Sequence, residues 1–115
     1  MDIIKELSDQ VVVLKLKGNI LSGVDANLIH QLIHEELELK HLHFVLDMSE
    51  VGLINSSGIG ILISSLTAAR NQKGDIVLAA VSEKVNHVLW MMRLNRVFGL
   101  YETVDQAKQK FLMEN

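Results

Sequence analysis

The strongest constraint on the fold is the way strand-like and helix-like segments alternate along the chain. Two short strand-forming segments come first, and amphipathic helical segments then alternate with apolar strand-like runs. We expect strands at 3–7, 11–17, 43–46, 76–81 and 100–101, and helices at 24–39, 57–72, 83–93 and 103–113. Strands that alternate with helices usually pair in parallel through right-handed crossovers. The sequence therefore predicts an α/β fold with a small, mixed, mostly parallel β-sheet faced by about four α-helices.

Two of the expected strands should differ in their burial. Apolar and basic residues alternate within 11–17, which predicts a strand with one face toward the core and, together with 3–7, an antiparallel hairpin. Residues 76–81 form a continuous apolar run, which predicts a strand buried on both faces.

Composition limits the function classes. The chain has 115 residues, no cysteine, no proline and no linker-like segment, so we expect one domain over 1–115 with neither disulfides nor thiolate chemistry. A net charge of −3 and 4% aromatic residues do not provide the basic surface of a nucleic-acid-binding protein. The sequence shows no secretory h-region and no apolar run of membrane-spanning length, so we expect a cytoplasmic protein without membrane insertion.

The segment 44–60 carries the most informative pattern. Its first residues are strand formers, and Asp47 and Ser49, which prefer turns, are expected to end that strand. The loop after them carries three apolar residues that are expected to pack onto the core: Val51, Leu53 and Ile54.

A helix start follows directly. Asn55, Ser56 and Ser57 are all good N-cap residues, and they precede a long helical apolar pattern. The unpaired N–H groups and positive dipole of a helix N-terminus suit an anion, so a phosphate on one of the two hydroxyls would be tolerated there. Gly58 and Gly60 remove side chains from the first turn, which lets another backbone or a phosphate come close.

These residues resemble the central motif of STAS domains, the domain of bacterial anti-sigma-factor antagonists: Asp47-x-Ser49, Val51 and Ile54-Asn55-Ser56-Ser57-Gly58-Ile59-Gly60. In that family the motif runs Asp-hydrophobic-Ser, two or three residues, then hydrophobic-Asp-Ser-Ser-Gly. The predicted order of strands and helices also matches the STAS fold, and the resemblance covers nearly the whole chain.

The resemblance implies a binding module that is switched by phosphorylation. The first serine of the family's pair is phosphorylated by the anti-sigma kinase, and it corresponds here to Ser56. The unphosphorylated protein would bind this anti-sigma factor serine kinase and free the sigma factor, and a phosphatase acting on phosphoserine would reset the cycle. The implied partner-binding residues are Asp25, Asp47, Ser49, Asn55, Ser57, Gly58 and Gly60.

The chain departs from the family pattern at two places. Asn55 stands where the family more often has Asp; it can cap a helix equally well and would repel a neighbouring phosphoserine less. Leu21 lies near the position where the family has an acid after the second strand, and an insertion within 18–25 would give that role to Asp25.

Several of these residues have a plainer alternative. Ser57 could cap the helix or point inward as a small residue, and Asp47 and Ser49 could simply end a strand rather than order the loop. His30 and His34 have the i, i+4 spacing of a zinc pair, but no acidic or cysteine ligand completes a set, so we predict no metal site.

The sequence offers little support for an enzyme. It has no Gly-x-Ser-x-Gly elbow, no Walker loop and no dinucleotide fingerprint, so we expect neither catalysis nor a cofactor. The alternative to the antagonist is a constitutive STAS scaffold subunit of a transport ATPase or a stress-signalling complex. Trp90, Met91 and Met92 could belong to the core and its rim or to a partner groove, since Met and Trp are common at interfaces.

Overall fold

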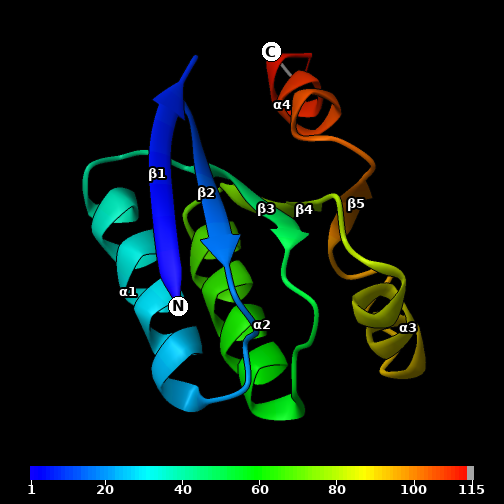
Figure 1. The fold of residues 1–115 in the computed structure, drawn as a ribbon. Coiled ribbons are helices and arrows are strands. Elements are labelled where there is room, and N and C mark those ends of the chain that lie inside the picture. Colours follow the sequence, from blue (N-terminus) through cyan, green and yellow to red (C-terminus); the bar gives the residue numbers. More distant parts are fainter. Residues whose placement is uncertain (114–115) are drawn as a thin grey trace.

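A computed structural model describes residues 1–113 of the chain. Five strands form one sheet in the order β1-β2-β3-β4-β5, in which β1 is antiparallel to β2 and the remaining pairs are parallel (Figure 1). The elements are β1 (Asp2–Ser8), β2 (Val11–Lys17), α1 (Gly23–Glu38), β3 (His43–Glu50), α2 (Ser56–Asn71), β4 (Asp75–Ala79), α3 (Glu83–Met91), β5 (Gly99–Tyr101) and α4 (Val104–Leu112). The predicted order of strands and helices is confirmed, and most ends move by one or two residues.

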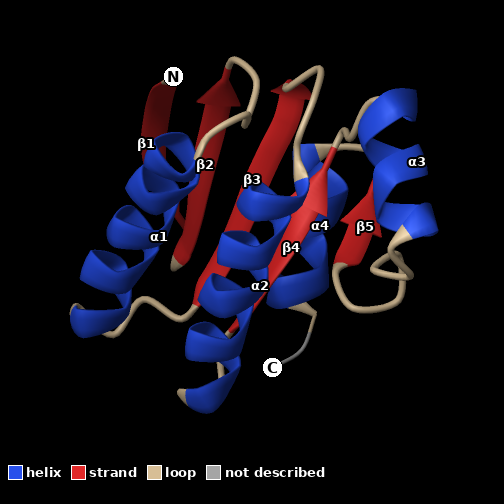
Figure 2. Ribbon diagram, turned by 90° about the horizontal axis from the view of Figure 1, so that it is seen from below, coloured by secondary structure: helices blue, strands red, loops and turns tan. Residues whose placement is uncertain are grey.

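The helices lie on both faces of the sheet, as Figure 2 shows, with α1 and α2 in front of the strands and α4 behind them. The larger core lies under α1 and α2, and α3 joins it through Val85 and Leu89. The smaller core lies under α4, where Ala107 and Phe111 pack on the valines of the central strands. Strand β4 is buried on both faces, as its continuous apolar run predicts.

Strand β3 is longer than expected. It continues through Asp47 and Ser49 to Glu50, so the prediction that these two residues end the strand is wrong. The reason is pairing with β2, in which Asp47 lies opposite Lys15 and Glu50 lies opposite Lys17 across a local register shift. Ladder hydrogen bonds and cross-strand neighbours outweigh the turn preference of Asp and Ser here.

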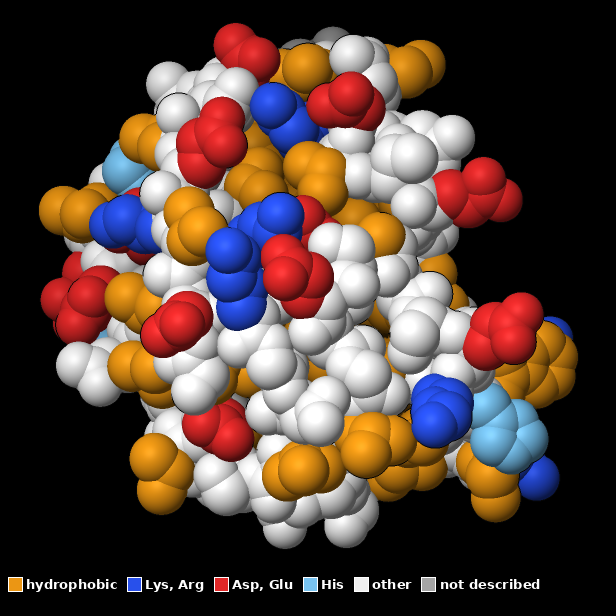
Figure 3. Space-filling view, in the orientation of Figure 1, with side chains coloured by type: hydrophobic (Ala, Val, Ile, Leu, Met, Phe, Trp, Pro, Cys, Tyr) orange, Lys and Arg blue, Asp and Glu red, His pale blue; other side chains and the backbone are white. Residues whose placement is uncertain are grey.

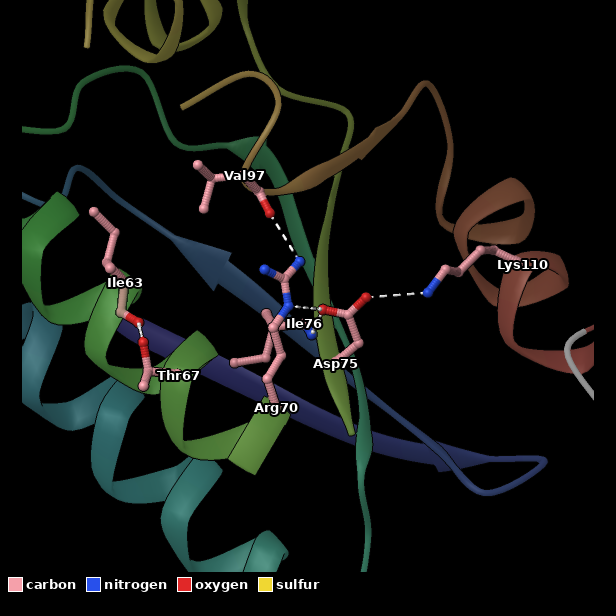
Figure 4. Close-up of polar contacts among 7 residues, drawn as sticks. All are labelled: Ile63, Thr67, Arg70, Asp75, Ile76, Val97 and Lys110. Atoms are coloured by element: carbon pink, nitrogen blue, oxygen red, sulfur yellow. Dashed lines mark hydrogen bonds and ion pairs between the residues drawn. The ribbon is translucent and has the colours of Figure 1, made fainter. Parts of the chain in front are cut away.

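The carboxylate of Asp75, at the start of β4, connects elements from both faces of the sheet (Figure 4). Its Oδ1 lies 3.2 Å from Nε of Arg70 on α2, and its Oδ2 lies 3.1 Å from Nζ of Lys110 on α4. The guanidinium of Arg70 also donates to the carbonyl of Val97, at 2.9 Å, just before β5. This cluster therefore ties α2, α4 and the segment before β5 to one end of β4.

A second polar cluster joins β1 to α1. The carboxylate of Glu36 is almost fully buried and accepts hydrogen bonds from Lys5 on β1 at 3.2 Å and from His41 Nδ1 at 3.1 Å. Burial opposes ionisation, but the hydrogen bonds from His41 and Lys5 and their charges outweigh it and hold the pKa of Glu36 below its ordinary value. Glu36 is therefore an ionised, fully paired group.

No helix among the described residues 1–113 combines the length and apolar character that a membrane span requires.

Candidate functional site

The loop between β3 and α2 is held against the loop between β2 and α1 by backbone hydrogen bonds. The amide of Gly18 donates to the carbonyl of Glu50 at 3.2 Å. Ile20 then forms an isolated parallel bridge with Ile54: its amide donates to Leu53 at 2.9 Å, and its carbonyl accepts from Asn55 at 3.1 Å. The two loops therefore form one paired unit at the end of the sheet that leads into α2.

Two asparagine side chains complete this unit. Oδ1 of Asn19 accepts hydrogen bonds from the amides of Gly52 and Leu53, both at 3.0 Å. Nδ2 of Asn55 donates to the carbonyl of Leu21 at 2.7 Å. Asn19 is not among the residues predicted from the sequence. An Asn after a strand favours side-chain-to-backbone hydrogen bonds, but local sequence does not identify partners more than 30 residues away.

Asn55 is the N-cap of α2, and its Oδ1 accepts the Gly58 amide at 2.9 Å. Ser56 is the first helical residue, so the predicted start at Ser57 is one residue late. Ser57 neither caps the helix nor points inward, because Asn55 takes the cap and Ser57 is exposed. Neither serine hydroxyl forms a hydrogen bond with any other described residue, and both serines face solvent.

The two glycines of the first turn have different surroundings. Gly58 is buried, and a Cβ built on it would lie 2.7 Å from Cγ2 of Ile20. The missing side chain therefore lets Ile20 of the neighbouring loop come close, as expected for the approach of another backbone. A partner-binding role of Gly58 stays a prediction. Gly60 is exposed, and a Cβ there would meet nothing within 4 Å. Only Gly60 of this pair leaves open surface.

The three apolar residues of the loop are divided between core and surface. Val51 and Ile54 are buried as predicted, whereas Leu53 is 44% exposed. Leu53 and Ile54 line a groove whose other wall is α3.

The remaining predicted partner-binding residues lie around this unit without touching the serines. Asp25 is in the first turn of α1, where its amide donates to Ser22 Oγ at 3.3 Å and its carboxylate lies 3.8 Å from the amino group of Met1. Oδ1 of Asp47 accepts the amide of Ser49 at 3.0 Å, and Ser49 is exposed. Within the described residues none of these three contacts Ser56 or Ser57 by a hydrogen bond or ion pair.

The histidine pair on α1 has a packing role. Nδ1 of His30 lies 2.7 Å from Oγ of Ser65 on α2, and that hydroxyl donates to the carbonyl of Ile61 at 3.1 Å. The ring of His34 stacks on His30 with centroids 6.3 Å apart. The hydrogen bond between His30 and Ser65 joins α1 to α2.

Comparison with known proteins identifies the fold family. The STAS domain profile matches residues 2–107 of the chain. The chain belongs to the STAS domain family. In this chain, the loop pairing and the asparagine cap described above lie beside Ser56 and Ser57.

Similar proteins of known description support this assignment. A curated relative and a crystal structure both carry the description "putative anti-sigma factor antagonist" and come from Thermotoga maritima. One is a curated relative that is 26% identical over 106 residues, covering 91% of this STAS domain chain and 93% of the relative. The other is a crystal structure with a TM-score of 0.86 and 25% identity, covering 94% of this chain and 92% of that one.

The Bacillus cell-fate determinant SpoIIAA, an anti-sigma factor antagonist, has the same fold. Its unphosphorylated form gives a TM-score of 0.75 at 13% identity and covers 99% of this chain and 100% of its own. Its phosphorylated form gives a TM-score of 0.75 at 16% identity and covers 96% of this chain and 99% of its own. At these identities the likeness concerns the fold, which is the small mixed sheet with four helices described above for this STAS domain.

Proposed function

We propose that this STAS domain is an anti-sigma factor antagonist whose binding is switched by phosphorylation of Ser56. Unphosphorylated, it binds an anti-sigma factor that is also a serine kinase and so releases the sigma factor. The kinase phosphorylates Ser56, and a phosphatase removes the phosphate. The protein acts by binding and not by catalysis. The relatives named as anti-sigma factor antagonists support this class of partner.

The observation that carries the proposal is that Asn55 caps α2, whereas Ser56 does not. Asn55 caps α2 and holds the neighbouring loop, so the Ser56 hydroxyl has no structural task and faces solvent at the first helical position. A phosphate there would gain the positive end of the helix dipole and the free N–H groups of the first turn. Phosphorylation would therefore leave the fold intact.

The switch acts through charge. A phosphoserine carries about −1.5 to −2 charges at pH 7 and is strongly hydrated, so docking a protein surface onto it costs desolvation and meets repulsion from partner carboxylates. Gly60 and Ser57 provide low, exposed surface beside Ser56 for the partner to approach. Ser49 is a further exposed contact, and Asp25 and Asp47 support the backbone around the site.

The direct experiment is phosphorylation with the serine kinase encoded nearest to this gene. The purified protein is incubated with ATP and this kinase, and its intact mass is measured before peptide mapping. We expect a gain of about 80 Da on Ser56. The adjacent Ser57 gives a matched control, because both serines are exposed and neither is hydrogen bonded: Ser57→Ala should accept phosphate and Ser56→Ala should not. No gain with a kinase that phosphorylates a control substrate would favour the constitutive scaffold.

A binding measurement tests the switch separately. We expect Ser56→Ala to bind the kinase constitutively and Ser56→Asp to bind weakly, in calorimetry at matched salt. Equal affinity of the two variants would contradict a switch at this residue.

A further inference from the structure

Helix α3 exposes a large apolar surface. Val85 and Leu89 are its buried residues, whereas Trp90 is 63% exposed and Met91 is 72% exposed. Met92, directly after the helix, is 43% exposed. Figure 3 shows hydrophobic, basic and histidine side chains, with an acidic side chain beside them, at the lower right of the molecule, where α3 lies. Large apolar side chains clustered on one element often mark an interaction surface.

A groove joins this helix to the loop that leads into Ser56. It has a volume of about 510 Å³. It is lined by Leu53 and Ile54 on the loop side and by four residues of α3 on the other: Glu83, Lys84, His87 and Val88. A second hollow of about 400 Å³ runs along α3 from Glu83 to Met91. The concave surface therefore begins two residues before the N-cap of α2 and extends to the exposed end of α3.

Basic side chains outnumber acidic ones around α3. Lys84, Arg93 and Arg96 are exposed, and none of them forms an ion pair with another residue in the described range 1–113. Glu83 is the single acidic residue between 80 and 98. The chain as a whole carries a net charge of −3, so this surface is a local exception. Apolar side chains flanked by unpaired cations complement an apolar surface flanked by carboxylates.

We propose that the groove between Leu53 and α3, together with Trp90 and Met91, receives an amphipathic helix with acidic flanks from the partner protein that docks at Ser56. This proposal rests on the proposed function, since it assigns a second contact to the same partner. Aliphatic residues of the partner helix fill the groove beside Leu53, and its carboxylates pair with Lys84, Arg93 and Arg96.

Two other occupants fit the surface less well. An anionic membrane would bind the same cations, but it has no side chains to fill a groove, and the net charge of −3 would oppose it. A second copy would have to offer a different surface to α3, and such a head-to-tail contact generates a ring or an open chain rather than a two-fold dimer.

The single tryptophan makes the test specific. Protein labelled with 5-fluorotryptophan gives one ¹⁹F resonance, from position 90, which is titrated with the unlabelled kinase while affinity is measured by calorimetry. We expect the resonance to shift on binding. We expect Lys84→Glu and Met91→Gln each to weaken binding roughly fivefold to tenfold. Both positions are exposed, and Lys84→Glu places an acid in the first turn of α3, so neither variant should unfold the protein.

Matched controls lie away from the groove. Lys73→Glu reverses an exposed charge just after α2, and Leu39→Gln removes an exposed apolar side chain just after α1; both should bind as the wild type does. Wild-type affinity in Lys84→Glu and Met91→Gln, with loss of binding in Ser56→Asp, would overturn this proposal and leave the antagonist function standing. Absence of kinase binding by the wild type would overturn both. The proposal would also be overturned if the resonance did not shift on kinase binding but shifted in one of two other conditions. A shift with phosphatidylglycerol vesicles would favour a membrane, and a shift on concentrating the protein alone would favour a second copy.

Discussion

The side-chain amide of Asn55 donates a 2.7 Å hydrogen bond to the backbone carbonyl of Leu21, while the oxygen of the same side chain caps α2. The cap requires an acceptor, because it faces the Gly58 amide, and the contact with Leu21 requires a donor. One residue therefore serves both loops, and it must be Asn for both bonds to form.

The first prediction concerns Asn55→Asp. The carboxylate retains the cap but faces the Leu21 carbonyl without a proton, so we expect the free energy of unfolding to fall by about 1–2 kcal/mol. Urea denaturation at pH 7 measures the change. Asn19→Asp is the matched comparison, because the Asn19 side chain accepts two amide hydrogen bonds through its oxygen and has no described hydrogen bond from its nitrogen. The free energy of unfolding should therefore fall less in Asn19→Asp than in Asn55→Asp. Equal losses would contradict the donor role of Asn55.

The second prediction separates the two glycines of α2. In Gly58→Ala the new methyl group would lie 2.7 Å from Ile20 Cγ2 and 3.3 Å from its carbonyl, so we expect a destabilisation of about 1–3 kcal/mol. Gly60→Ala meets nothing within 4 Å and should stabilise the helix by roughly 0.5–1 kcal/mol. Thermal denaturation of the two variants should therefore move in opposite directions. Similar melting temperatures would show that the Ile20 contact relaxes easily.

The third prediction concerns the pH dependence that Glu36 contributes. Because the pKa of Glu36 is held below its ordinary value of 4.5, the ionised carboxylate stabilises the folded state above that value. This stabilisation should be lost as the pH falls through the lowered pKa. We expect Glu36→Gln to be less stable than the wild type by about 1–2 kcal/mol at pH 7 and the difference to shrink below about pH 4. Chemical denaturation across pH 3–7 measures both curves, and a constant difference would contradict the assignment.

The fourth prediction concerns Asp75. Replacing it with Ala removes the shared partner of Arg70 and Lys110 at the start of β4, and we expect a loss of about 1–2 kcal/mol. Glu38→Ala is the control, because its pair with His34 is exposed and should contribute less than about 0.5 kcal/mol. Amide exchange should also increase in α4 for Asp75→Ala only.

The sequence predicts the elements better than their ends and faces. The spacing of apolar residues is sufficient to predict the order of strands and helices, because each segment has enough of them to distinguish a helical from a strand periodicity. The extension of β3 through Asp47 and Ser49 depends on pairing with β2, which no local preference encodes. The position of α4 on the second face likewise depends on Phe111 packing against strands far away in the chain.

The position of the candidate site could be predicted from the sequence, but the role of each residue in it could not. Asn55, Ser56 and Ser57 are equivalent as caps when only local sequence is considered. The choice of Asn55 depends on the Leu21 carbonyl, which a loop more than 30 residues earlier in the chain supplies. The packing role of Gly58 is set by Ile20 in the same loop and is equally invisible to local pattern.

The pairing of the two loops also has a kinetic consequence. Hydrogen bonds donated by the Gly18 and Ile20 amides and accepted by Asn19 Oδ1 hold the segment before Ser56 in place without any ligand. A docking protein therefore has little loop ordering to carry out. Encounter would then resemble the association of two rigid bodies, whose rates vary little among related complexes. We therefore expect a phosphate on Ser56 to act mainly on how long the complex lives, and much less on how fast it forms.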